Sequence, residues 1–109
     1  MNPSITTQDS KQPAYGFTVT AGNLVIRLGH KVQGPTVTLF ATTQIADNAP
    51  MMWRQFETPR HSAVDAAEML ADDAMEYAES TGGVIRPSED LDIDDFLHHL
   101  HLTIQGELN

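Results

Sequence analysis

The segment TVTLFATT, residues 36–43, is rich in β-branched side chains and predicts a β-strand. Two segments before it, residues 15–20 and 24–28, place apolar side chains at every second position, which is the period of a strand with one buried face. Turn signals separate the three segments at residues 21–23 and 33–35. Because these connections are too short to hold crossover helices, the strands are expected to form an antiparallel meander.

A fourth strand is predicted over residues 51–56, between Pro50 and Pro59. Strict alternation would give two faces, Met51/Trp53/Gln55 and Met52/Arg54/Phe56. Each face would hold a large apolar residue, so either both faces are covered or one set is open to a partner. The commoner arrangement is an edge strand whose extra apolar side chain packs at the rim of the fold. A binding patch is the alternative, because Trp and Arg are enriched in interface hot spots.

A long helix is predicted between Ser62 and the Gly82-Gly83 pair. Ser62 is a suitable N-cap with Asp65 three residues later, close to a capping box, and the glycines supply a C-terminal stop. Apolar residues recur at helical spacing and form one stripe that can pack on a sheet: Val64, Ala67, Leu70, Ala71, Ala74, Tyr77 and Ala78.

A second helix is predicted over residues 87–105, with Ser88 or Asp92 as its cap. One helical face would carry Ile93, Phe96, Leu97, Leu100 and Ile104. Residues 99–104 also alternate strictly and could form a last strand, but we favour the helix. The predicted fold is therefore α+β: a three- or four-stranded antiparallel meander with one long amphipathic helix packed on it and a C-terminal helix. Residues 1–13 are expected to be a flexible tail, and residues 14–109 a single domain.

Composition narrows the classes of function. The chain of 109 residues has no cysteine, which excludes disulfides, thiol nucleophiles and cysteine-ligated zinc. It shows no signal peptide and no apolar segment of the length that spans a bilayer, so we expect a cytoplasmic protein without a membrane partner. Phosphate-binding loops, dinucleotide fingerprints and nucleophile elbows are absent from the sequence. We accordingly expect no enzyme, no catalytic residues and no cofactor.

Charge is divided unevenly along the chain. Residues 1–60 carry five basic and three acidic side chains, whereas residues 61–109 carry one basic and twelve acidic side chains. The net charge of −9 disfavours direct binding to nucleic acid, because affinity for phosphate needs a basic surface. A protein partner with a basic surface is expected instead.

The acidic side chains of the long helix form a row. Asp65, Glu68, Asp72, Glu76 and Glu79 fall within roughly 80° of the helix circumference, and Asp73 lies beside them. The row is about 21 Å long, so its six carboxylates give one charge per roughly 3.5 Å. One strand of B-DNA carries a phosphate every ~3.4 Å. The match suggests that the row imitates a nucleic-acid backbone, although acidic faces more commonly serve solubility alone.

Three histidines, His98, His99 and His101, follow Asp94 and Asp95 on the second helix. On a helix, Asp94, His98 and His101 would share a side and could hold a metal ion. The favoured interpretation assigns no metal to them, because acidic residues at a helix start and histidines near its end complement the helix dipole. A pH-responsive surface is a further alternative.

Taken together, these features predict a small acidic protein-binding module. In size, acidity and absence of catalytic motifs it is similar in type to the small inhibitors that phages and mobile elements encode against CRISPR and restriction systems. The expected partner-binding residues are Asp65, Glu68, Asp72, Asp73, Glu76, Glu79, Met51, Trp53 and Arg54. The alternative is a homodimeric accessory or structural protein whose acidity serves solubility only and whose interface uses Met51, Met52, Trp53 and Phe56.

Overall fold

A computed structural model describes residues 14–87 and 91–107 of the chain. Four antiparallel strands form one sheet in the order β1-β2-β3-β4: β1 (Ala14–Ala21), β2 (Leu24–Gln33), β3 (Thr36–Ile45) and β4 (Met51–Pro59). A short 3-10 turn, η1 (Arg60–Ser62), leads into helix α2 (Ala63–Gly82), and helix α3 (Ile93–Glu107) follows. The α+β fold predicted from the sequence is confirmed, with four strands in the meander.

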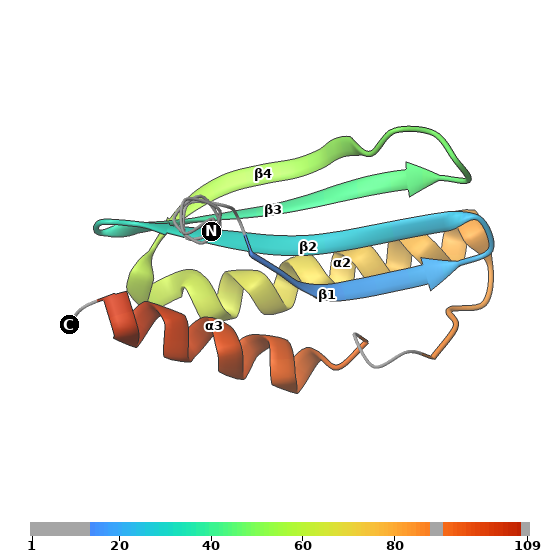
Figure 1. Cartoon of the computed structure of the whole chain (residues 1–109). Coiled ribbons are helices and arrows are strands. Elements are labelled where there is room, and N and C mark those ends of the chain that lie inside the picture. The colour runs from blue at the N-terminus through green and yellow to red at the C-terminus, as the bar shows by residue number, and fades with distance from the viewer. Residues whose placement is uncertain (1–13, 88–90, 108–109) are drawn as a thin grey trace, which may run out of the picture.

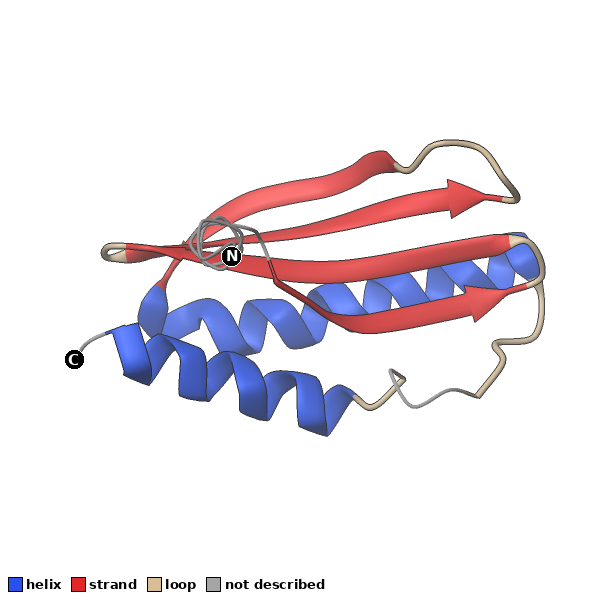
Figure 2. Cartoon of the chain, viewed as in Figure 1, coloured by secondary structure: helices blue, strands red, loops and turns tan. Residues whose placement is uncertain are grey.

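Both helices lie on the same face of the sheet, which gives the fold two layers (Figures 1 and 2). Helix α2 contacts all four strands, whereas α3 packs beside α2 against β1 and β2. This arrangement leaves the helix-side face of β4 less covered than that of the other strands. The alternative strand over residues 99–104 was wrong, since these residues belong to α3.

The core lies between the two layers. The sheet contributes alternating side chains that include Val19, Ile26 and Leu39, each fully buried. Helix α2 buries five alanines and Leu70 against them, and small side chains let the helix axis approach the sheet closely. Helix α3 adds Phe96, Leu100 and Ile104. The predicted apolar stripes are therefore largely the buried ones, although Val64 and Tyr77 are only partly buried.

Helix caps were predicted with mixed success. Ser62 stands at the N-cap position of α2, but its side chain makes no capping hydrogen bond, because the preceding residues already turn as η1. The predicted capping box with Asp65 is therefore wrong. Asp92 does cap α3, since its Oδ1 accepts a hydrogen bond from the backbone N–H of Asp95 at 3.1 Å. The helix begins at Ile93, later than expected, and Ser88 and residues 1–13 lie outside the described residues.

A β-bulge interrupts the pairing of β4 with β3. Arg54 pairs with Ala41 and Met52 pairs with Thr42, so Trp53 is the extra residue. A bulge places two successive residues opposite one partner and disturbs the alternation of faces. The predicted division of residues 51–56 into two alternating faces is therefore wrong. Trp53 and Arg54 both reach side chains of α2.

Candidate functional site

The acidic row is on the outer side of α2. Its five members are all exposed: Asp65, Glu68, Asp72, Glu76 and Glu79. Within residues 14–87 and 91–107, none of the five takes part in an ion pair. The row is therefore a surface of uncompensated negative charge, produced by helical periodicity on the side away from the buried alanines.

Asp73 differs from the other five carboxylates of the predicted set. Its Oδ2 is 2.6 Å from Nη1 of Arg54, and the two side chains are 48% and 47% exposed. Both are half in water, so the pair contributes at most about 1 kcal/mol to stability. Its larger consequence is local, because Arg54 cancels the charge of Asp73 on the flank of α2 that faces β4.

An aromatic contact lies next to this ion pair. The rings of Trp53 and Tyr77 are stacked, with their centroids 5.0 Å apart, and the guanidinium carbon of Arg54 is 4.5 Å from the Trp53 ring centroid. Stacking of this kind contributes about 0.5–1.5 kcal/mol beyond the buried area. Three expected partner-binding residues, Trp53, Arg54 and Asp73, thus contact one another or Tyr77 and fasten β4 to α2.

Exposed apolar side chains gather along the β4 edge. Five large ones lie at the end of β3, on β4 or on the adjacent flank of α2: Ile45, Met51, Met52, Phe56 and Met69. Met51 and Met69 are each 69% exposed. A shallow groove of about 240 Å³ runs between Phe56 and Met69. Because β3 is the only strand that pairs with β4 among the described residues, this apolar edge also presents backbone groups without a partner in that part of the chain.

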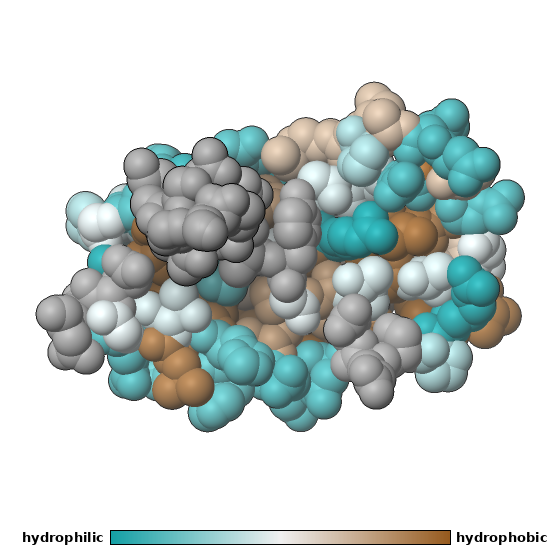
Figure 3. Space-filling model, in the orientation of Figure 1, coloured by the Kyte–Doolittle hydropathy of each residue, from teal (hydrophilic) through white to brown (hydrophobic). Residues whose placement is uncertain are grey.

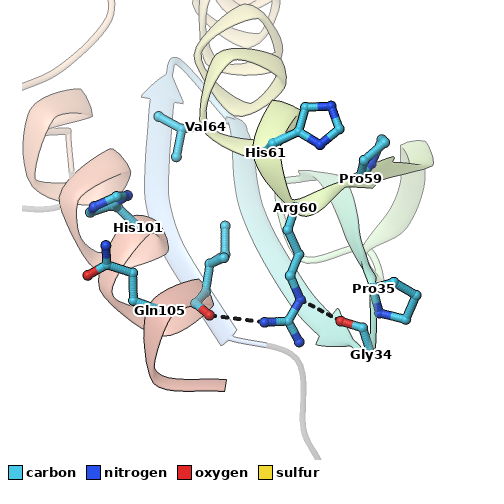
Figure 4. A pocket seen from close by; sticks show the side chains of 9 residues that line it. Gly34, Pro35, Pro59, Arg60, His61, Val64, His101 and Gln105 are labelled. Atoms are coloured by element: carbon cyan, nitrogen blue, oxygen red, sulfur yellow. Dashed lines mark hydrogen bonds between the residues drawn. The ribbon is translucent and has the colours of Figure 1, made fainter. Parts of the chain in front are cut away.

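A larger pocket, of about 870 Å³, opens where the β2–β3 turn, the β4–α2 junction and the end of α3 meet (Figure 4). Arg60 lies between these elements. Its Nε donates to the carbonyl of Gly34, and its Nη1 donates to the carbonyl of Ile104 at 3.1 Å. The second bond satisfies a carbonyl in the C-terminal part of α3, where the helix dipole favours a cation.

His30 is a polar residue within the helix-facing side of the sheet. It is 6% exposed, and its ring centroid lies 6.4 Å from that of Phe96 on α3. Its Nδ1 is buried and has no hydrogen-bond partner among the residues that the structure describes. Burial lowers the pKa of His30 below its ordinary value, because the charged ring would lose its hydration.

The histidines of α3 do not form a metal centre with their acidic neighbours. Within the described ranges, no group of three or more His, Cys, Asp or Glu side chains is arranged to hold a metal ion. Nε2 of His99 lies 3.8 Å from Oδ1 of Asp95, one turn earlier in α3, and both side chains are largely exposed. The outer surface of α3, along the lower edge of the space-filling view, is mostly hydrophilic (Figure 3).

Sequence reasoning found the acidic row but missed the pocket. The residues that line the pocket come from separate parts of the chain, so no spacing of residues within one segment predicts it. In the sequence, Arg60 is only one of the five basic residues among residues 1–60. The one available signal was its position between Pro59 and the start of the long helix, and this does not reveal contacts with Gly34 and Ile104.

Comparison with protein-family models, with curated proteins and with solved structures gave no match. Over the described residues, neither helix combines the length and the apolar character needed to cross a bilayer.

Proposed function

We propose that this protein is a protein-binding inhibitor that places the acidic row of α2 in a basic, nucleic-acid-binding surface of its partner. The observation that carries the proposal is the row itself: five exposed carboxylates on one side of a helix, without an ion-pair partner among residues 14–87 and 91–107. Asp73 is set apart from the row because Arg54 neutralises it.

The spacing of the row suits this role. Five charges over about 21 Å lie on average roughly 5 Å apart along the helix axis, which is of the same order as the ~3.4 Å between successive phosphates along one strand of B-DNA. Like charges one turn apart destabilise a helix by a few tenths of a kcal/mol per pair. The row therefore has a folding cost, which a partner with complementary charge would offset on binding.

The partner class follows from the sign of the charge. A chain of net charge −9 repels nucleic acid, whereas a basic groove on a protein attracts such a chain. Association would be fast and weakened by salt, since long-range attraction between exposed charges is screened. A cytoplasmic nucleic-acid-handling complex, of the kind that phage and mobile-element inhibitors block, fits this description.

The first test neutralises part of the row without changing side-chain shape. The triple variant Asp65→Asn, Glu68→Gln and Asp72→Asn removes three charges from α2. We expect it to lose the proteins that the wild type captures from lysate in low salt, and we expect wild-type complexes to be released by salt and by added duplex DNA. Quantitative mass spectrometry of the captured proteins measures both effects.

A matched control removes three exposed charges elsewhere: Asp47→Asn, Glu57→Gln and Asp94→Asn. Both variants have the same net charge, so only the position of the charge differs. The control is expected to capture the same proteins as the wild type. If both variants lose capture to the same extent, binding depends on net charge and not on the position of the row. If the row variant captures as much as the wild type, the mimicry is refuted.

A second candidate function, a homodimeric accessory protein, is favoured by a different observation. The apolar β4 edge combines exposed Met51, Met52 and Phe56 with an edge strand, and such edges are templates for pairing with another chain. In this case the acidity of α2 would serve solubility, and the oligomeric state is the quantity to measure.

A further inference from the structure

The pocket at the end of the sheet is larger than the other grooves described above, and it is separate from the acidic row. It is formed by nine residues of the β2–β3 turn, the β4–α2 junction and α3: Gly34, Pro35, Pro59, Arg60, His61, Val64, His101, Ile104 and Gln105. Its volume of about 870 Å³ falls within the roughly 300–1,000 Å³ typical of small-molecule sites. The dimensions therefore suit a small ligand.

The lining has the opposite charge character to the rest of the molecule. The whole chain has 15 acidic and six basic side chains, yet the nine lining residues that the structure describes include Arg60 and two histidines and no carboxylate. Pro35, Pro59, Val64 and Ile104 supply apolar surface between these polar groups. A ligand with an apolar body and an anionic end would match both the apolar and the basic residues of this lining.

Arg60 is held in place before any ligand binds. Its two hydrogen bonds, to the carbonyls of Gly34 and Ile104, use two of the five N–H groups of a guanidinium (Figure 4). Within the described residues, no hydrogen bond is recorded for its other N–H groups. A planar guanidinium fixed in this way loses little conformational freedom when it binds an acceptor with carboxylate geometry.

His61 and His101 line the pocket from different elements, η1 and α3, and their rings lie apart from the guanidinium of Arg60 (Figure 4). Both are exposed, and each ring can donate a hydrogen bond to an oxygen. The described lining therefore offers hydrogen-bond donors at three separate positions.

We propose that this pocket binds a small amphipathic monocarboxylate, with its carboxylate at Arg60 and its apolar body against Val64, Ile104, Pro35 and Pro59. A cationic ligand is disfavoured because the lining residues that the structure describes include no carboxylate. A ligand with several negative charges is disfavoured because the net charge of −9 repels it and only one lining residue is permanently cationic. The site does not depend on the function proposed for α2.

Titration with decanoate, decanol and decylamine tests the charge preference with one apolar chain and three head groups. The readout is the nitrogen–proton NMR spectrum of the labelled full chain, followed at the Nε–H of Arg60 and at the backbone amides of the pocket residues. Decanoate is expected to give saturable shifts there and to bind at least about tenfold more tightly than decanol, a difference that one charge-assisted interaction can supply. Decylamine is expected to give no saturable shift at these residues.

Pairs of variants on α2 and α3, one inside the pocket and one outside it, test whether decanoate binds in the pocket. Val64→Trp fills the pocket from α2, whereas Met69→Trp adds the same ring to exposed surface of α2 outside it. His101→Glu places a carboxylate in the lining, and His99→Glu makes the same substitution at an exposed position of α3 that does not line the pocket. The two pocket variants are expected to weaken decanoate binding at least about tenfold, and the two controls to leave it unchanged.

Several outcomes would overturn the proposal: no saturable shift with decanoate, equal binding of decylamine, or full binding by His101→Glu, which needs no change in the core. Shifts at the pocket that follow protein concentration in the absence of decanoate would place a second copy of the chain there and would equally refute a small-molecule site. None of these results bears on the acidic row, because neither pocket variant removes a carboxylate of α2.

Discussion

At the scale of single residues, His30 couples the core to pH. Its ring is buried beside Phe96 with Nδ1 unpaired, and burial lowers its pKa, so the native state favours the neutral ring. In the unfolded chain a histidine titrates near pH ~6.5. The unfolded state therefore binds more protons between that value and the lower native pKa, and stability falls as pH falls through this window.

We predict that the free energy of unfolding decreases by up to about 1.4 kcal/mol per pH unit below pH ~6.5 because of this one group. His30→Leu should remove that part of the pH dependence and should not reduce stability at neutral pH, since it also removes an unpaired buried nitrogen. Urea unfolding of both proteins from pH 5 to pH 8 measures the difference. Parallel pH profiles for wild type and variant would contradict the prediction.

At the scale of elements, the end of α2 meets the β1–β2 turn in a close contact that requires glycine. A Cβ on Gly82 would lie 2.2 Å from the carbonyl oxygen of Ala21, and Gly22 in the turn has a φ of +60°. Neither partner in this contact is a flexible side chain. The contact fixes where α2 ends relative to the sheet.

Two Gly→Ala substitutions in helices should consequently have opposite effects. Gly82→Ala is expected to destabilise the protein by about 1–3 kcal/mol or more, because the backbone of β1 must move. Gly106→Ala in α3 meets open space and should stabilise by up to about 1 kcal/mol, because alanine is the better helix former. Thermal unfolding of both variants measures these changes in stability. A Gly82→Ala variant as stable as the wild type would show that the close approach is not maintained in solution.

Elements whose signal is local were predictable from the sequence, and contacts between distant segments were not. The alanine stripe and the acidic row of α2 follow from one periodicity, so both could be predicted before the fold was seen. The bulge at Trp53 could not be predicted, because residues 51–56 read as an uninterrupted alternating strand in the sequence. The pairing of Asp73 with Arg54 joins residues 19 apart in sequence, and the pocket joins a turn, η1 and α3. Such features depend on strand register and on helix placement, which sequence pattern does not give.

At the scale of the whole molecule, charge and apolar surface are separated. The acidic row faces away from the sheet, whereas the flank of α2 beside β4 carries Met69 and the neutralised Asp73. Along β4 the exposed Met51, Met52 and Phe56 continue this low-charge surface. An acidic chain can therefore approach a copy of itself at this edge with less repulsion than at any part of the row.

This separation allows the two candidate functions to be distinguished by their opposite dependence on salt. Repulsion between two chains of net charge −9 is screened by salt, so pairing through the β4 edge should strengthen as salt rises, while binding of the row to a basic partner should weaken. Sedimentation velocity over a range of concentrations at low and high salt measures self-association. Met52→Lys combined with Phe56→Lys should abolish it by placing charge on the edge strand.

The matched control for that variant is Val84→Lys combined with Leu102→Lys, which also adds two lysines at exposed apolar residues, but outside β4. It should self-associate as the wild type does. A wild type that stays monomeric in high salt would remove the homodimer as a candidate and leave the apolar edge to a different chain. Dimerisation that survives the double lysine variant would instead place the contact elsewhere on the surface. Only loss in the double variant with retention in the control identifies the β4 edge as the site of pairing.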